Sequence, residues 1–139
     1  MSVNIPESHR DLLEGPVVVT IGTVNPDGQP QLSAVWAGFD GDGQTVLVNT
    51  AVGRQKEKNL RQRPQATVLA IDPQNPYRYL EVRGSVELTR EGALDHINQM
   101  AKLYTGQDSY YGGVTPADLA EQETRILVKI KPNRVVANG

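Results

Sequence analysis

The chain has 139 residues, contains no cysteine and carries a formal net charge of −2 at pH 7. This length is enough for a hydrophobic core, and we expect residues 1–139 to form a single domain. Without cysteine the chain has no disulfide, thiolate nucleophile or cysteine metal ligand, and its weakly negative charge argues against a nucleic-acid partner.

The N-terminal stretch lacks the charged and apolar regions of a signal peptide, and no apolar run approaches the roughly 20 residues that cross a bilayer. We therefore expect no membrane partner and, by default, a cytoplasmic protein. Residues 6–13 favour a short helix. Three β-rich segments follow, separated by two turn signatures of Asn, Asp, Pro and Gly. Because such turns join antiparallel neighbours, a meander of hairpins is predicted over residues 17–24, 31–39 and 44–49.

A basic stretch, residues 51–64, follows the third of these segments and contains five lysines and arginines against one acid. Arg54 and Lys56 would lie in the first turn of a short helix, where the helix dipole disfavours cations. A bound anion, most simply a phosphate, would explain their position. The alternative is a solvated basic face, because Arg54, Lys58 and Arg61 share one side of a helix.

The second half of the chain predicts three more strands and a longer helix. Apolar residues alternate over 77–88, where Gly84 indicates a bulge or a barrel corner. Apolar residues at helical spacing predict an amphipathic helix over 91–104, and residues 116–123 favour one or two helical turns. The other two strands are expected over 66–71 and 125–130, the last with an extension toward Val136.

Six strands, with helices inserted after the third and the fifth, predict a mainly β fold, a six-stranded antiparallel barrel. A barrel of this size fills its interior with side chains and leaves little room for a ligand. We therefore expect a ligand outside the barrel, in a groove against a helix or a second subunit.

Three motifs occur in order along the chain: GTVNPDGQPQLS at 22–33, R-x-K-x-x-N-L-R-x-x-P at 54–64, and V-x-G-x-V-x-L at 82–88. In this order and spacing, the chain resembles the pyridoxamine 5′-phosphate oxidase-like FMN-binding split-barrel family over nearly its whole length. The short form with R-x-K-x-x-N-L resembles a branch of probable F420-dependent enzymes. The extra basic FMN ligands and the C-terminal substrate motif of the longer pyridoxamine phosphate oxidases are not found.

The resemblance implies a homodimer with a flavin-type cofactor at the subunit interface, the cofactor being FMN, the deazaflavin F420 or sometimes haem. Carried over to this chain, the basic pair would bind the phosphate, two strand segments would contact the ring, and the later basic residues would suit the anionic tail of F420. Asn59 matches a polar family position, although it could equally hold a loop. The cofactor-binding residues expected in this way are Pro30, Gln31, Ser33, Val48, Asn49, Thr50, Ala51, Arg54, Lys56, Lys58, Asn59 and Arg61.

The function that this resemblance implies is an F420H2-dependent oxidoreductase that transfers hydride to an unsaturated small molecule. The alternatives are an FMN-dependent oxidoreductase or flavin reductase, and a non-catalytic protein that binds flavin, F420 or haem. Hydride transfer leaves most of the chemistry to the cofactor, so no catalytic residue is assigned. The candidate proton donors, chosen by default, are Tyr79, Tyr110 and Tyr111.

Three other residues carry weaker signals. His9 and His96 have no metal-ligand neighbours, so no metal site is expected, and His96 is interpreted as a helix-surface residue. Trp36, the single tryptophan, is expected in the core or at the dimer interface rather than stacked on a cofactor ring.

Overall fold

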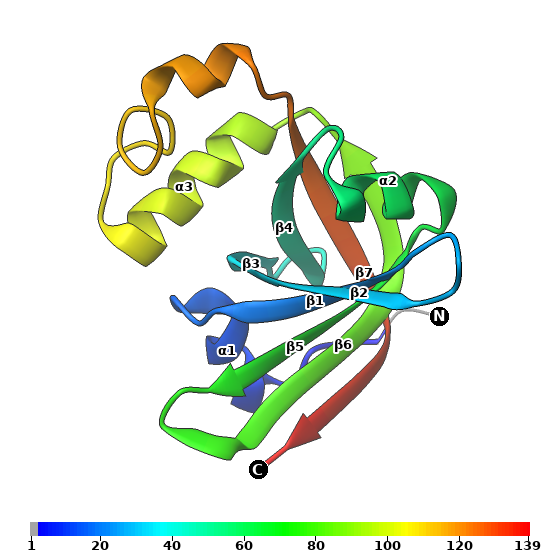
Figure 1. The fold of residues 1–139 in the computed structure, drawn as a ribbon. Coiled ribbons are helices and arrows are strands. Elements are labelled where there is room, and N and C mark those ends of the chain that lie inside the picture. The colour runs from blue at the N-terminus through cyan, green and yellow to red at the C-terminus, as the bar shows by residue number, and fades with distance from the viewer. Residues whose placement is uncertain (1–2) are drawn as a thin grey trace.

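The computed structural model describes residues 3–139, and over this range seven strands form one antiparallel sheet in the order β2-β1-β5-β6-β7-β4-β3. Figure 1 shows the sheet curled around its own interior. The mainly β split-barrel prediction is therefore confirmed. The strands are β1 (Val19–Val24), β2 (Pro30–Val35), β3 (Ala37–Asp40), β4 (Thr45–Ala51), β5 (Gln65–Asp72), β6 (Asn75–Thr89) and β7 (Arg125–Asn138).

The prediction of six strands differs from the structure at Trp36, where the single strand expected over 31–39 is divided into β2 and β3. β2 pairs with β1 and β3 pairs with β4, at opposite edges of the sheet. The continuous segment 30–40 thus contributes one strand to each edge of the sheet, and the chain turns between the two strands. The hydroxyl of Tyr104 stabilises this turn, because it accepts the Ala37 N–H at 3.0 Å and donates to the Val17 carbonyl at 2.7 Å.

The bulge predicted at Gly84 is confirmed. Arg83 pairs with Arg134 and Gly84 pairs with Pro132, so β7 carries one extra residue, Asn133. A Cβ atom at position 84 would overlap the Lys131 carbonyl oxygen, which explains why this position of β6 is a glycine.

The helices lie around the curled sheet rather than inside it. The helix expected over 6–13 is a 3-10 turn followed by a short α-helix, while the other three expected helical segments are present close to their predicted bounds. None of the helices described within residues 3–139 is long and apolar enough to cross a bilayer. The segments are η1 (Glu7–His9), α1 (Asp11–Glu14), α2 (Gln55–Gln62), α3 (Ala93–Thr105) and η2 (Ala117–Glu121).

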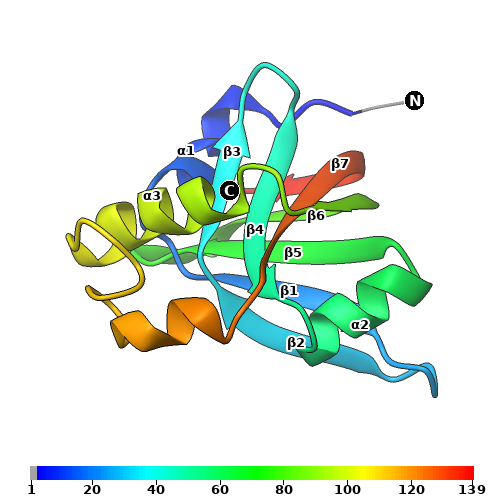
Figure 2. The same ribbon diagram turned by 90° about the horizontal axis from the view of Figure 1, so that it is seen from above.

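The core fills the interior of the sheet, because every second side chain of a strand points inward and most of these side chains are apolar. Figure 2 shows α3 and η2 together on one side of β4 and α2 on the other, with the beginning of β7 between them. Fully buried side chains of the core include Leu13, Val19, Ile21, Val46, Val48, Leu80, Val82 and Ile130.

Candidate functional site

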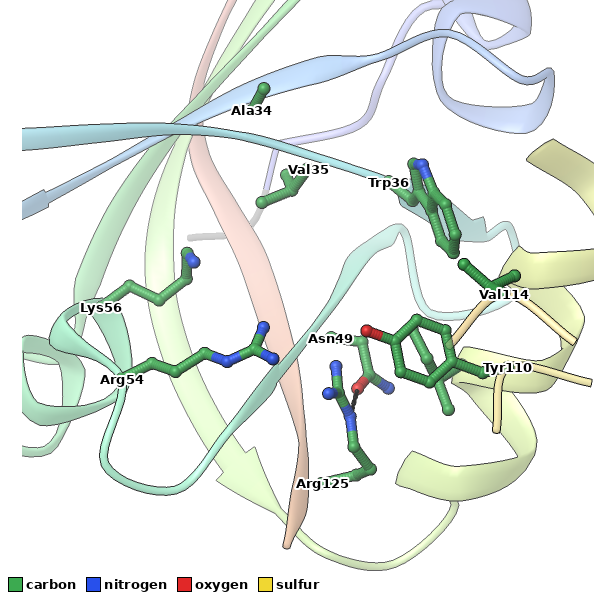
Figure 3. A pocket seen from close by; sticks show the side chains of 10 residues that line it. Ala34, Val35, Trp36, Asn49, Arg54, Lys56, Tyr110, Val114 and Arg125 are labelled. Carbon is green, nitrogen blue, oxygen red and sulfur yellow. Dashed lines mark hydrogen bonds between the residues drawn. The ribbon is translucent and has the colours of Figure 1, made fainter. Parts of the chain in front are cut away.

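A pocket of about 250 Å³ opens between the beginning of α2 and the side of the molecule formed by α3 and η2. Figure 3 shows two basic side chains entering it from the α2 side, opposite two aromatic rings, with a third cation and an asparagine between them. The residues that line the pocket are Ala34, Val35, Trp36, Asn49, Arg54, Lys56, Ile97, Tyr110, Val114 and Arg125.

Asn49 lies in the middle of this pocket, between its basic and its aromatic side chains. It lies on β4 between two residues whose side chains are buried on the inner face, so its own side chain points outward to α3. Its Nδ2 donates to the Ala93 carbonyl at 2.8 Å and lies 3.1 Å from Nδ1 of His96. Its Oδ1 accepts from Nε of Arg125 at 2.8 Å, a bond drawn in Figure 3. Asn49 thus connects β4 to both α3 and β7.

Arg125 supplies a buried cation at the start of β7, with only 7% of its surface exposed. Its guanidinium lies 5.1 Å from the centre of the Tyr110 ring, in the arrangement of a cation–π contact. Its Nη1 pairs with Oε1 of Glu123 at 3.2 Å. The guanidinium is therefore fixed by an amide, a carboxylate and an aromatic ring.

Glu123 is the acid that contacts these cations. Oε1 accepts from the Tyr111 hydroxyl at 2.6 Å, and Oε2 pairs with Nη2 of Arg54 at 3.2 Å. The hydrogen bond from Tyr111, followed by the charges of Arg54 and Arg125, holds the pKa of Glu123 below its usual value. Glu123 is therefore ionised at neutral pH and bridges the two arginines.

Lys56, the second residue of α2, makes no ion pair with any residue in the described part of the chain. Burial lowers the pKa of its ammonium group, and the charges of Arg54 and Arg125 lower it further. Three cations therefore converge on the pocket with one carboxylate among them. Such an excess of positive charge at a half-buried position is suited to an anionic ligand.

The opposite wall is aromatic. The ring of Trp36 stacks on Tyr104 with 5.4 Å between ring centres and meets Tyr110 edge-on at 6.2 Å. Trp36 is half-buried at the turn between β2 and β3 and forms part of the pocket wall. Of its two expected positions, the core is therefore wrong, and the dimer interface stays a prediction. The place of Trp36 in the sequence does not predict that it lines a pocket, because the turn that directs its side chain outward depends on Tyr104 of α3.

His96 is buried, with 5% of its surface exposed, and the interpretation as a helix-surface residue is wrong. Burial, followed by the nearby charge of Arg125, lowers its pKa to about 4. Because Asn49 donates to Nδ1, the neutral ring carries its proton on Nε2. This nitrogen is buried and has no hydrogen-bond partner within residues 3–139.

The residues predicted on β2 do not line this pocket. Pro30 faces a second hollow of about 440 Å³ on the outer side of β1, β2, β5 and β6. The amide oxygen of Gln31 accepts from the Thr23 hydroxyl at 3.0 Å, and the hydroxyl of Ser33 is buried. Their assignment as ring contacts stays a prediction.

Of the predicted residues at the end of β4, only Asn49 reaches the pocket. The side chains of Val48, Thr50 and Ala51 are buried, with exposed fractions of 0, 0 and 3%. Any contact that these three residues make with a ligand must therefore come from their backbone.

The predicted residues of the basic stretch divide into two groups. Arg54, directly before α2, and Lys56 line the pocket, whereas Lys58 is exposed on the helix surface. Asn59 is buried and donates from Nδ2 to Thr23 at 3.0 Å and to Asn25 at 2.9 Å. These contacts favour the interpretation of Asn59 as the residue that holds the loop between β1 and β2.

Of the later basic residues, which the resemblance suited to the anionic tail of F420, Arg61 has an acidic partner. Its Nε pairs with Oε2 of the buried Glu57 at 2.5 Å, and Oε1 of Glu57 accepts the Gly53 N–H at 2.8 Å. Arg63 is also engaged, because its Nε donates to the Val24 carbonyl at 2.9 Å. Within residues 3–139 no group of three histidine, cysteine or acidic side chains is arranged to hold a metal ion.

The most important residue that sequence reasoning missed is Arg125. Its single local signal is a basic residue placed directly before the apolar run Ile126–Val128, which indicates a charge at the start of a buried strand. Nothing in the local sequence connects it to Asn49.

The model of the pyridoxamine 5′-phosphate oxidase family matches residues 5–138. The chain belongs to this family. The family resemblance predicted from the three motifs is thus confirmed.

Three solved structures show how the chain relates to other proteins with this fold. An F420 reductase is 34% identical, with a TM-score of 0.78 over 95% of this chain and 98% of that protein. A conserved hypothetical protein from Mycobacterium tuberculosis is 25% identical, with a TM-score of 0.75 over 99% of this chain and 86% of that one. HupZ from Group A Streptococcus, at 17% identity and a TM-score of 0.68 over 96 and 93% of the two chains, shares the fold alone.

Proposed function

We propose that this protein is an F420H2-dependent reductase that transfers hydride to an unsaturated small molecule. The observation that carries the proposal is the pocket in which Arg54, Lys56 and Arg125 converge opposite the rings of Trp36 and Tyr110. Similarity to an F420 reductase over 95% of the chain supports F420 as the cofactor in preference to FMN.

The residues of the pocket fit both parts of a deazaflavin. Arg54 and Lys56 would hold the phosphate, because an arginine can fork onto two phosphate oxygens and the lysine has no acidic partner in the described chain. Trp36 and Tyr110 offer aromatic surface to a flat ring. When bound, the cofactor supplies the hydride, while the protein binds, orients and excludes water.

Tyr110 is the best placed of the three tyrosines to deliver a proton to the reduced product. It lines the pocket, whereas the hydroxyl of Tyr111 donates to Glu123. Tyr79 lies on β6, where it pairs with Ile71 of β5 and Asn138 of β7, and it does not line the pocket. Replacing Tyr110 with Phe should therefore lower turnover without abolishing cofactor binding.

The family resemblance also leads us to propose a homodimer. The outer side of β2 and of the β5–β6 hairpin exposes large apolar residues, with Leu32 65% and Tyr77 78% exposed. A second copy of the chain would cover such surface. Light scattering at micromolar concentration should then report about twice the chain mass, and a monomer with full cofactor affinity would contradict a shared site.

The decisive experiment is a visible spectrum of the purified protein, followed by titrations with F420 and FMN and an assay of F420H2 oxidation with unsaturated substrates. We expect a colourless protein that binds F420 and turns over. A yellow preparation with the FMN spectrum would favour the FMN alternative, and a Soret band would favour haem. Binding of F420 without turnover on any substrate would favour a carrier protein.

A further inference from the structure

The carboxylate of Glu123 stands behind the cationic side of the pocket. It contacts Arg54 through one oxygen and Arg125 through the other, both at 3.2 Å, but it lies in the wall of a neighbouring hollow of about 240 Å³. Its side chain is 23% exposed. Glu123 can therefore act on a ligand in the pocket through its charge and through the two arginines, without touching the ligand.

These contacts set the charge that the pocket presents to a phosphate group. With Glu123 ionised, the three cations Arg54, Lys56 and Arg125 leave a net charge of +2. A phosphate monoester brings about −1.5 to −2 charges at pH 7, whereas a phosphodiester brings one. The carboxylate repels the additional charge of the monoester, and it accepts one N–H of each arginine, which is then not offered to the phosphate.

We propose that Glu123 is a specificity-determining residue, which makes this pocket prefer a ligand with a singly charged phosphodiester over a ligand with a phosphate monoester. The inference rests on the proposed function, because F420 contains a phosphodiester and FMN a terminal monoester. The hydrogen bond from Tyr111 supports it, since it stabilises the ionised carboxylate at Oε1, the oxygen that also accepts from Arg125.

A purely structural role of Glu123 predicts a different change in ligand affinity. If Glu123 only held Arg54 and Arg125 in position, its neutralisation would loosen both side chains and weaken every phosphate-bearing ligand. If Glu123 sets the charge of the pocket, neutralisation strengthens the monoester most, the diester less, and leaves a ligand without phosphate unchanged. The two roles are therefore distinguished by whether neutralising Glu123 weakens or strengthens the binding of phosphate-bearing ligands.

The test compares Glu123→Gln with the parent by fluorescence titration with FMN, F420 and riboflavin. The amide can still accept from Tyr111, so the variant should fold, which circular dichroism verifies. We expect the ratio of FMN to F420 affinity to rise roughly three- to tenfold, as befits about half to one additional charge near a half-buried carboxylate. Riboflavin, which has no phosphate, should bind as it does to the parent.

Glu121→Gln is the matched control, because Glu121 is exposed on the same segment and makes no ion pair within residues 3–139. It should leave the affinity ratio unchanged. An unchanged ratio in Glu123→Gln, or an equal loss for FMN and F420, would overturn the inference while the parent's preference for F420 still upheld the proposed function. A parent that prefers FMN would overturn both.

Discussion

Nε of Arg125 donates to Oδ1 of Asn49 at 2.8 Å, and the two residues are 76 positions apart in the sequence. The bond joins the beginning of β7 to the end of β4, which are neighbours in the sheet. It fixes a buried guanidinium at the edge of the pocket, because the other side of Asn49 is itself held by α3. The position of the cation therefore depends on three separate segments of the chain.

Replacing Arg125 with Lys should weaken F420 binding although the charge is kept. One ammonium group cannot reproduce the fork that reaches both Asn49 and Glu123, and the loss of hydrogen bonds to a charged group costs about 1.5–3 kcal/mol. Isothermal titration of the parent and the variant measures this loss. Arg134→Lys, an exposed substitution on the same strand, is the control, and equal affinities in Arg125→Lys and the parent would refute the assignment.

Replacing Lys56 with Ala should weaken cofactor binding by about 1.5–3 kcal/mol, because Lys56 is a cation directed into the pocket. Lys58→Ala, on the exposed surface of the same helix, should cost only about 0.2–1 kcal/mol. Titrations with F420 and FMN at two salt concentrations distinguish them, and the difference should be larger at low salt. Equal effects of the two lysines would show that the helix contributes only a diffuse positive field.

Stability should fall as the pH drops below the ordinary pKa of histidine. The pKa of His96 is lowered from 6.5 to about 4 in the folded chain. Between these two values the imidazole is protonated in the unfolded chain and neutral in the folded chain. At pH 4.5 this linkage should cost roughly 2–3 kcal/mol of unfolding free energy. Urea denaturation of the parent and His96→Gln between pH 7.5 and 4.5 measures it. The same pH dependence in both proteins would exclude His96 as the cause.

Replacing Gly84 with Ala should destabilise the fold by about 3 kcal/mol or more, because the new Cβ would overlap the Lys131 carbonyl and approach the Ile130 side chain at 2.8 Å. Gly41→Ala is the matched control, since its Cβ would meet nothing nearer than the Phe39 ring at 3.9 Å. Thermal denaturation compares the two variants. Similar melting temperatures would mean that β6 and β7 separate at the bulge without cost.

The regular elements were largely predictable because their signals are local. Turn residues mark the hairpins, alternation marks β6, and helical spacing of apolar residues marks α3. The bulge was predictable from Gly84 for a similar reason, since a glycine inside an apolar strand indicates that another backbone segment approaches closely. The pocket was predictable in part, through Arg54 and Lys56 at the beginning of a helix.

The sequence by itself therefore determined the mainly β fold, the family and the two cations that precede and begin α2. Only the tertiary structure decided that Trp36 lies at a turn between two sheet edges, that Arg125 meets Asn49, that His96 is buried and that Arg61 is neutralised by Glu57. The physical reason is that hydrophobic spacing reports one face of one element. Burial and ion pairing depend on which other element packs against that face, and here the partners are distant in sequence.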